Sequence, residues 1–463
     1  MSFCGAFPSV LGITSGLGTA RSRFLLPDEP PPPPAARTGA DTRQPGHRRP
    51  LCACPREGNE REDTTIDVIS LKAETGGSLW NPVVCRVNTD AGIHGYGEAA
   101  MAYAIGSSGA SGMVKDFAGL VVGMDPLANE VIWEKLYKET MWAQNGGLVA
   151  FAAISAIDMA LWDIKGKFFD VPVHQLLGGK RRDRLRSYAS QLQYGWGERV
   201  GRCSRVSDYV DACTKALDEG FDAVKIDYLI FDGDGNRFVP EQTTRLLPSA
   251  TLGLVEERLA ATRKAVGSGD IIIEAHSSTD VASAIQIGKR AEKYDIFYYE
   301  EPTTPHPELH RRVADAVDIP LASGERIYGR WDYAPYLEAG ILGVIQPDLG
   351  TCGGLTEAKK ICDTAATYDI GVQLHVCGTP LSTAAALQVE AVLPNFTIHE
   401  HHIFNRMSWN KDLCVHDYQP VDGHIEVPDL PGLGNELSAY ALENAHIETV
   451  SERRERYTRT PSK

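Results

Sequence analysis

The chain has 463 residues, of which 43% are hydrophobic and 23% charged, a balance typical of globular proteins. A formal net charge of -15 argues against a nucleic-acid partner, because nucleic-acid binders concentrate Lys and Arg to meet phosphates. The sequence contains no apolar run of about 18 residues, so no membrane span is predicted. The ten cysteines are scattered without C-x-x-C spacing, which predicts reduced thiols and a cytoplasmic protein.

Residues 1–62 differ in composition from the remainder. An unbroken proline run, Pro30 to Pro34, is followed by an Arg- and Gly-rich stretch. Such a segment cannot bury a hydrophobic core. We expect it to be either disordered or an extension foreign to the native protein, and we assign it no function.

Residues 63–185 predict an α+β domain. "TTIDVISLKA" and "NPVVCRVNTDAGIHGYGEA" have strand patterns, and the second turns at Asp90–Gly92. From about Gly106 the pattern becomes helical, and "FAAISAIDMALWDIKGK" places apolar residues at helical spacing. The Gly- and Ser-rich stretch "AMAYAIGSSGASG" is typical of a mobile lid over an active site.

Residues 186–403 alternate short apolar strands with amphipathic helices. The eight strand candidates are "RSYAS", "FDAVKIDY", "DIIIEAHS", "IFYYEEP", "IPLASGE", "GVIQPDLG", "IGVQLHVC" and "NFTIHEH". This alternation predicts an α/β fold, a TIM barrel of (β/α)7β type whose last unit is incomplete. We expect residues 404–449 to return to the first domain, which they would help to build as a capping domain, and residues 450–463 to form a tail.

Ionisable residues recur where these predicted strands end. Barrel enzymes build their active sites at the carboxyl ends of the strands, and a strand buried on both faces is otherwise apolar. In chain order the residues are Lys225, Asp227, Glu274, His276, Glu300, Glu301, Glu325, Asp348, His375 and Glu400.

Three of these carboxylates predict a metal site. Glu274, Glu300 and Glu325 follow one another at spacings of 26 and 25 residues, about one barrel repeat, so their side chains should converge. Three ionised carboxylates cannot share one site without a cation, and oxygen ligands favour Mg²⁺. The alternative for any one of them is an ordinary salt bridge with Lys or Arg.

Two histidines are candidates for proton transfer. His375 and Asp348 end neighbouring predicted strands, and a carboxylate beside an imidazole fixes its tautomer and raises its basicity. His276 should lie across the cavity. The alternative is that they are hydrogen-bonded core residues. His399, His401 and His402 crowd the eighth strand, and we assign them no role.

Several stretches resemble the enolase superfamily, mandelate racemase subgroup, and are most similar to its galactonate dehydratase branch. They are "AISAIDMALWDIKGK", "IEAH", "YYEEP", "SGERIYGRWD", "QPDLGTCGGLTEAKKI", "QLH" and "PGLG". The resemblance runs from about Thr64 to Leu442. It implies a barrel with a capping domain, and a homo-oligomer.

The resemblance also implies roles for the site residues. Glu274, Glu300 and Glu325 would ligate one Mg²⁺ per active site, and His375 with Asp348 would form the general base for the α-proton. Glu400, in protonated form, would hydrogen-bond the substrate carboxylate opposite the metal. His276 would protonate the departing β-hydroxyl.

Two positions depart from the family pattern. Glu274 stands where many dehydratases of this branch carry Asp, which changes the reach of the ligand. Asp227, in Lys225-Ile226-Asp227, stands in place of the second Lys of the racemases' Lys-x-Lys, which disfavours racemization. Asp227 would orient His276, contact a sugar hydroxyl, or simply pair with Lys225. The residues expected to contact substrate are Lys225, Asp227, Arg326, Trp331 and Glu400, together with the loop that follows Asp227.

The sequence thus predicts a Mg²⁺-dependent lyase, a dehydratase of an aldonate or aldarate. The enzyme would remove the α-proton, form an enediolate and eliminate water to give a 2-keto-3-deoxy acid. A cycloisomerase of a sugar lactone or anhydro-sugar acid is the main alternative, because it would share the first step. A racemase, an epimerase and a non-catalytic barrel protein are less favoured. The expected partner is a small sugar acid, with neither nucleic acid nor membrane.

Overall fold

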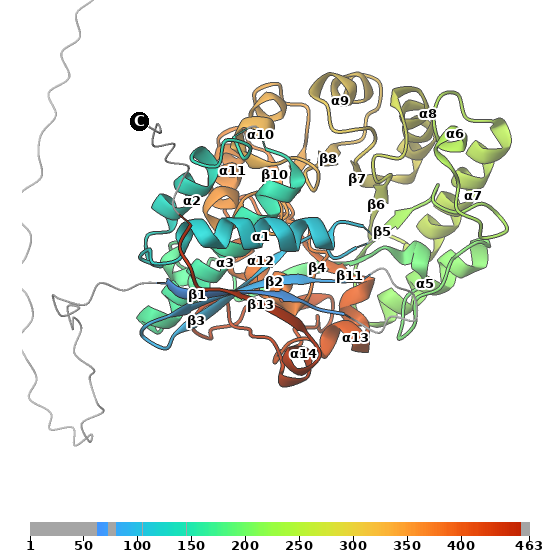
Figure 1. Ribbon diagram of the computed structural model, residues 1–463. Helices are drawn as coiled ribbons and strands as arrows, with labels where there is room; N and C mark the ends of the chain where they lie inside the picture. The colour runs from blue at the N-terminus through green and yellow to red at the C-terminus, as the bar shows by residue number, and fades with distance from the viewer. Residues whose placement is uncertain (1–62, 73–79, 104, 145, 455–463) are drawn as a thin grey trace, which may run out of the picture. The chain divides into compact units, whose positions relative to one another are not determined.

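A computed structural model describes residues 63–72, 80–103, 105–144 and 146–454 (Figure 1). The predicted extension at 1–62 and most of the predicted tail lie outside the described residues.

The first sheet is antiparallel and has the strand order β13-β1-β2-β3. Strand β1 (Asp63–Ser70) pairs with β2 (Val83–Thr89), which turns at residues 90–92 into β3 (His94–Ala99). The outer strand, β13 (His446–Val450), comes from the other end of the chain and pairs with β1. Figure 1 shows this red strand beside the blue N-terminal strands. The C-terminal segment therefore completes the N-terminal sheet.

Four helices follow this sheet: α1 (Ser107–Val121), α2 (Asn129–Lys138), α3 (Leu148–Phe169) and α4 (Val173–Leu176). Helix α3 lies close against β3 because Gly97 has no side chain: a Cβ there would lie 2.1 Å from the carbonyl oxygen of Ala156. The lid predicted in the Gly- and Ser-rich stretch stays a prediction, and the structure adds that part of the stretch is helical. From Ser107 onward that stretch is helix α1, whose buried Ala110, Val114 and Phe117 recur at helical spacing.

The second sheet contains eight parallel strands in the order β10-β9-β8-β7-β6-β5-β4-β11. They are β4 (Arg184–Ser190), β5 (Ala223–Asp227), β6 (Asp270–Glu274), β7 (Ile296–Glu300), β8 (Leu321–Ser323), β9 (Val344–Ile345), β10 (Gly371–Val372) and β11 (His399–His402). Backbone bonds from Val372 to Asn395 and from Thr397 to Val372 join the two ends of the sheet. The sheet thereby closes into a barrel.

Seven major helices connect these strands in turn. They are α5 (Val206–Asp218), α7 (Ser249–Val266), α8 (Val281–Ala291), α9 (Pro307–Ala314), α10 (Gly329–Glu338), α11 (Gly354–Thr367) and α12 (Pro380–Glu390). The predicted (β/α)7β barrel with an α+β capping domain is confirmed. The remaining short elements are η1 (Leu192–Tyr194), α6 (Pro240–Thr243), η2 (Glu292–Tyr294), η3 (Ile403–Arg406), α13 (Ser408–Lys411), β12 (His424–Glu426), which pairs with β4, and α14 (Ala439–Glu443).

Buried polar contacts join the two domains beside the carboxyl ends of the barrel strands. Ser155 of α3 accepts hydrogen bonds from the backbone N–H groups of Gly353 and Gly354, where α11 begins. Glu98 of β3 is fully buried and accepts hydrogen bonds from Thr379 and Ser382, where α12 begins. The capping domain is therefore fixed to the loops that follow β9 and β10.

Glu98 should make stability depend on pH. Burial raises its pKa to about 7, although the hydrogen bonds from Thr379 and Ser382 act in the opposite direction. A carboxyl with a raised folded-state pKa binds its proton more tightly in the folded chain, so its stabilising contribution is lost as the pH rises from about 4.5 to about 7. Urea denaturation should therefore show a smaller loss of stability between pH 5 and pH 8 in Glu98→Gln than in the wild type. Equal losses in the two proteins would contradict this assignment.

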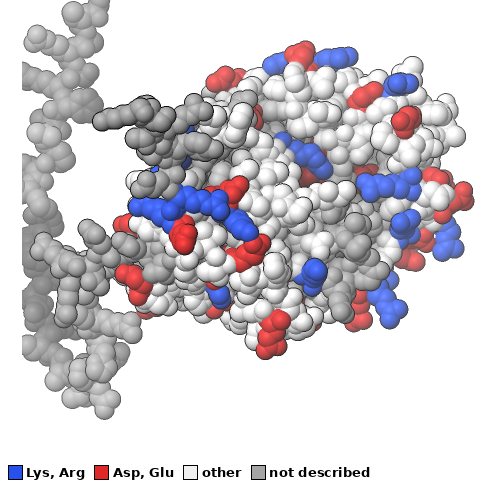
Figure 2. Space-filling model, in the orientation of Figure 1, with Lys and Arg blue, Asp and Glu red and all other residues white. Residues whose placement is uncertain are grey.

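The surface in Figure 2 carries Lys and Arg side chains interspersed with Asp and Glu side chains. None of the helices in the described residues combines the length and apolar character needed to cross a bilayer. Six of the described cysteines are free thiols: Cys203, Cys213, Cys352, Cys362, Cys377 and Cys414.

Candidate active site

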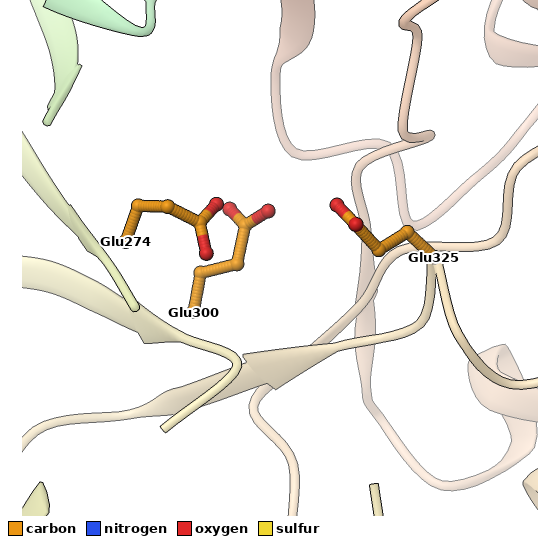
Figure 3. A group of neighbouring side chains, drawn as sticks. All are labelled: Glu274, Glu300 and Glu325. Atoms are coloured by element: carbon orange, nitrogen blue, oxygen red, sulfur yellow. The ribbon is translucent and has the colours of Figure 1, made fainter. Parts of the chain in front are cut away.

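Three carboxylates converge at the carboxyl ends of neighbouring barrel strands. Glu274 ends β6, Glu300 ends β7 directly beside it in the sheet, and Glu325 follows β8 by two residues. One oxygen from each lies within 4.8 Å of the others. Figure 3 shows the carboxyl groups of Glu274 and Glu300 side by side, with that of Glu325 facing them. The group could hold a metal ion.

The surroundings of this group favour a cation. The Oε2 atom of Glu300 is buried without a hydrogen-bond partner, and that of Glu274 is buried 3.3 Å from Lys225 Nζ. Burial, reinforced by Glu325 and opposed by Lys225, raises the pKa of Glu274 to about 7. Burial also raises the pKa of Glu301 to about 8 and that of Glu300 well above its ordinary value. These carboxylates lack enough positive charge to be ionised together, and a hard divalent cation would supply it.

Lys225 lies beneath the carboxylates and contacts three of them. Its Nζ is 2.8 Å from Glu300, 2.9 Å from Glu400 and 3.3 Å from Glu274, and the side chain is fully buried. Burial alone would lower the pKa of Lys225, but Glu300, Glu400 and Glu274 together raise it well above its ordinary value. Lys225 therefore keeps its positive charge at the floor of the site.

The contacts of Glu400 favour its carboxylate form in the absence of substrate, and the protonated form that the resemblance implies stays a prediction. Its Oε1 accepts a hydrogen bond from Ser190 at 2.6 Å, and its Oε2 accepts one from the backbone N–H of Val376 at 3.0 Å. Burial acts to raise its pKa, but Lys225 and His375 hold that pKa well below the ordinary range. Each of these contacts stabilises the carboxylate form of Glu400.

His375 and Asp348 form the pair that the sequence predicts. The Nδ1 of His375 lies 2.6 Å from Oδ2 of Asp348, and its Nε2 lies 3.2 Å from Oε2 of Glu325. Burial would lower the pKa of His375, but Glu325 and the hydrogen bond to Asp348 raise it to about 10. Part of this rise depends on the charge of Glu325, so it should diminish when that charge is neutralised.

His276 belongs to a closed ring of hydrogen bonds. The backbone N–H of Asp227 donates to Gln193, the amide of Gln193 donates to Gln191, and Gln191 Nε2 donates to His276 Nε2 at 3.1 Å. The ring closes where His276 Nδ1 lies 2.8 Å from Asp227 Oδ2. The backbone N–H of Asp227 can only donate, and this fixes the direction of each later hydrogen bond in the ring. His276 Nε2 is therefore an acceptor, and the proton of the neutral imidazole lies on Nδ1. His276 also has a φ of 45°, a left-handed conformation that ordinary side chains rarely adopt.

A cavity of about 540 Å³ connects these groups. From the barrel its lining includes Gln191, His276, Glu325, Arg326, Asp348, His375 and His402. From the capping domain it includes Ala100, Met101, Tyr103, Ile105 and Leu148. Both domains therefore shape the cavity. Its lining residue Glu325 lies beside the buried group of Lys225, Glu274, Glu300 and Glu400, which we call the floor of the site.

Two predicted substrate contacts lie in different places. Arg326 lines the cavity and contacts the carboxylates of both Glu301 and Glu325. Trp331 does not line it: the indole stacks on Tyr137 of α2 at 4.6 Å and lies over the Arg330 guanidinium. It occupies the outer side of helix α10, where it packs against the capping domain.

The sequence did not lead us to predict Gln191 and Gln193 as site residues. They follow the first barrel strand at alternate positions in "SQLQY", the same placement that identified the charged site residues. Their amides carry no charge, so the search for ionisable groups at strand ends passed over them. A search for any polar residue at these strand ends would have found them.

The chain matches two protein-family models. Residues 73–178 match the mandelate racemase / muconate lactonizing enzyme N-terminal domain, and residues 208–441 match the enolase C-terminal domain-like family. A D-galactonate dehydratase from Xanthomonas euvesicatoria is 34% identical over 370 residues, 78% of this chain and 90% of the relative. A D-xylonate dehydratase from Haloferax volcanii is 31% identical over 393 residues, which are 84% of this chain and 90% of the relative.

Solved structures extend the likeness to the fold. An enolase superfamily member from Salmonella Typhimurium has 48% identity and a TM-score of 0.82, covering 84% of this chain and all of its own. The 3,6-anhydro-D-galactonate cycloisomerase from Zobellia galactanivorans has 27% identity and a TM-score of 0.70, over 83% of this chain and 99% of its own. With both of its domains matched, the chain belongs to the enolase superfamily, in the mandelate racemase and muconate lactonizing enzyme group.

Proposed function

We propose that this protein is a Mg²⁺-dependent dehydratase that converts an aldonate or aldarate into a 2-keto-3-deoxy acid. The observation that carries the proposal is the presence of two His–Asp pairs, His375–Asp348 and His276–Asp227, whose imidazoles line one cavity beside three carboxylates. One imidazole can take a proton while the other gives one. Curated relatives that act on galactonate and xylonate support a sugar acid as the substrate.

Glu274, Glu300 and Glu325 would hold the cation, as their convergence and the unpartnered Oε2 of Glu300 suggest. When bound, Mg²⁺ supplies positive charge to the substrate carboxylate as the α-proton leaves. Lys225, charged and fixed by Glu400 and Glu300, adds to the positive potential of the floor. Both groups are preorganised, so their stabilisation costs little reorganisation during the reaction.

His375 removes the α-proton in this proposal. Asp348 accepts a hydrogen bond from Nδ1, which fixes the ring and leaves Nε2 to receive the proton. To act as the acid, His276 must first be doubly protonated, with the Gln191 amide turned so that it no longer donates to Nε2. It then gives its Nε2 proton to the β-hydroxyl, and the C–O bond breaks to release water. Asp227 holds the ring of His276 through Nδ1, so Nε2 is the nitrogen that would act on the substrate.

A substrate screen tests this function. The purified protein with Mg²⁺ is incubated with mono- and diacid sugars, anhydro-sugar acids and lactones, and products are scored by mass. A keto-deoxy product lighter than its substrate by one water is the expected result. A keto product of unchanged mass would favour the cycloisomerase, the second candidate, for which the Zobellia galactanivorans structure is the supporting observation.

His276→Asn should separate the two half-reactions. Without the imidazole proton donor, water loss should slow by about 10²–10⁴-fold, a usual effect for general acid catalysis. Exchange of the α-proton with solvent deuterium should continue, because His375 and Asp348 keep their contact. NMR of the recovered substrate measures exchange, and product formation measures elimination. Loss of both in a folded variant would contradict separate roles for the two histidines.

We also propose that the protein forms a homo-oligomer, because the family it resembles suggests one. Light scattering of the purified protein would give the number of subunits, and a monomer would refute it.

A further inference from the structure

His402 is a third histidine of the cavity and has no role in the proposed chemistry. It ends β11 and, two residues after Glu400, lies on the same face of that strand. It lines the cavity together with His276 and His375. His401, between Glu400 and His402 in sequence, points to the opposite face and packs against Phe221 and Trp196.

A backbone contact determines which nitrogen of His402 can carry a proton. The N–H of Phe404 donates a hydrogen bond to Nδ1 of His402 at 3.1 Å. A backbone N–H can only donate, so Nδ1 presents its lone pair, and the neutral ring must carry its proton on Nε2. Within the described part of the chain, no hydrogen-bond acceptor is found for Nε2. The Phe404 ring, with its centroid 4.7 Å from that of the imidazole, further restricts the ring.

We propose that His402 is a substrate-binding residue whose Nε2–H donates a hydrogen bond to a hydroxyl oxygen of the sugar acid. This inference rests on the proposed function and deepens it, because it adds a specificity contact beyond the reacting carbons.

The electrostatic surroundings keep this donor neutral. Burial lowers the pKa of His402 to about 3, and His375, Lys225 and His276 act in the same direction while Glu400 opposes them. The ring is therefore uncharged over the range in which enzymes usually work. A neutral donor in a site already rich in ionised groups suits an uncharged hydroxyl oxygen.

The position along β11 distinguishes a hydroxyl from the reacting carboxylate. Glu400 lies at the floor beside Lys225, and two residues of strand place His402 roughly 7 Å closer to the mouth of the cavity. A sugar acid whose carboxylate binds beside Lys225 and a cation held by the three glutamates would present its hydroxyl-bearing carbons at that height. His402 would therefore recognise a hydroxyl group of the substrate. A substrate without that hydroxyl group would leave the Nε2–H donor unpaired.

The tautomer can be tested without a substrate. Long-range ¹H–¹⁵N NMR of the histidine-labelled full chain, compared with His402→Asn for assignment, should show His402 with a protonated Nε2 and an unprotonated Nδ1 from pH 6 to pH 8.5. A proton on Nδ1, or a charged ring in this range, overturns the proposal. The tautomer is measured on the wild-type protein, and the variant serves only to assign the His402 signal. Any other folded substitution at this position would serve equally well for the assignment.

The use of the donor is tested by kinetics on the acid that the wild type dehydrates. In His402→Asn, the amide oxygen can still accept from Phe404, but no N–H reaches as far as Nε2. The expected result is a KM raised about 10- to 100-fold, the usual effect of losing a buried hydrogen bond. The rate of α-proton exchange at saturation should change far less, since His375 is intact.

His401→Asn is the matched control, because it alters the neighbouring histidine on the opposite face of β11. Its KM should equal that of the wild type. An unchanged KM in His402→Asn, or equal increases in both variants, overturns the proposal. A wild-type protein that turns over no sugar acid refutes the proposed function and the hydroxyl partner with it. An Nδ1–H signal refutes the donor alone, so the two failures are distinguishable.

Discussion

His375→Asn should slow exchange of the substrate α-proton with solvent deuterium by at least about 10²–10⁴-fold, the usual contribution of general base catalysis. The reason is positional: the Nδ1 of His375 is held by Asp348 at 2.6 Å, and its Nε2 faces the cavity beside Glu325. Asparagine fills part of the space and cannot accept the proton. The measurement is NMR of substrate incubated in D₂O, which detects proton removal even when water is not lost.

A matched control exists on the outer side of the barrel wall. His399 is also a buried histidine 2.6 Å from a carboxylate, that of Glu390, but neither residue lines the cavity. His399→Asn removes an equivalent contact between a buried histidine and a carboxylate, and it should leave the exchange rate of the folded enzyme unchanged. Exchange that persists in His375→Asn, or that falls equally in His399→Asn, would show that His375 is not the base.

Asp348→Asn should give an intermediate loss. It keeps the shape of the side chain, but the amide can donate to Nδ1 and thereby favour the wrong tautomer of His375. Comparing the three variants separates the proton acceptor, its orienting partner and the general effect of breaking a contact between a buried histidine and a carboxylate.

The convergence of Glu274, Glu300 and Glu325 could be predicted because barrel geometry repeats. Residues about one repeat apart at the ends of parallel strands reach the same layer, and the structure places one oxygen from each within 4.8 Å of the others. The same reasoning located the His375–Asp348 pair on adjacent strands. These features depend on the sequence spacing and the fold class alone.

The charge of Glu400 could not be predicted in this way. It depends on donors from three different segments, Ser190, Lys225 and Val376, whose distances only the folded chain determines. Its position was predictable, but its protonation state required the surrounding geometry.

The orientation of the Trp331 side chain could not be predicted from the sequence. The residue lies in "SGERIYGRWD", near residues that do reach the cavity, yet its helix turns the indole toward Tyr137. Closeness in sequence to Arg326 does not determine the direction of a side chain on the following helix. Gln191 and Gln193 show the converse, because neutral amides acquire importance only through the ring that joins them to His276.

Removal of divalent cations should abolish activity, and Mg²⁺ should restore it. Glu274, Glu300 and Glu325 have ligand oxygens within 4.8 Å of one another, and burial, reinforced by Glu325 and opposed by Lys225, raises the pKa of Glu274 to about 7. Calorimetry should find one Mg²⁺ per chain in EDTA-treated, desalted protein. Mg²⁺ at 100 times its Kd should stabilise the fold by about 2.7 kcal/mol, because only the folded chain assembles the three ligands.

Glu300→Gln is the decisive variant, because it removes one ligand charge at the centre of the group while keeping the side-chain size. Mg²⁺ affinity should fall by more than about 10-fold, since even residues that only support metal ligands can cost 10- to 100-fold. Glu390→Gln is its control, as Glu390 is also buried and paired but lies with His399 away from the cavity. Both variants lose a buried carboxylate. If Glu300 holds the cation, Glu300→Gln should lose the Mg²⁺-dependent stabilisation, whereas Glu390→Gln should keep it. Full activity in metal-free buffer, or equal Mg²⁺ binding by both variants, would show that the three glutamates form a buried ion-pair network with Lys225 and hold no catalytic metal.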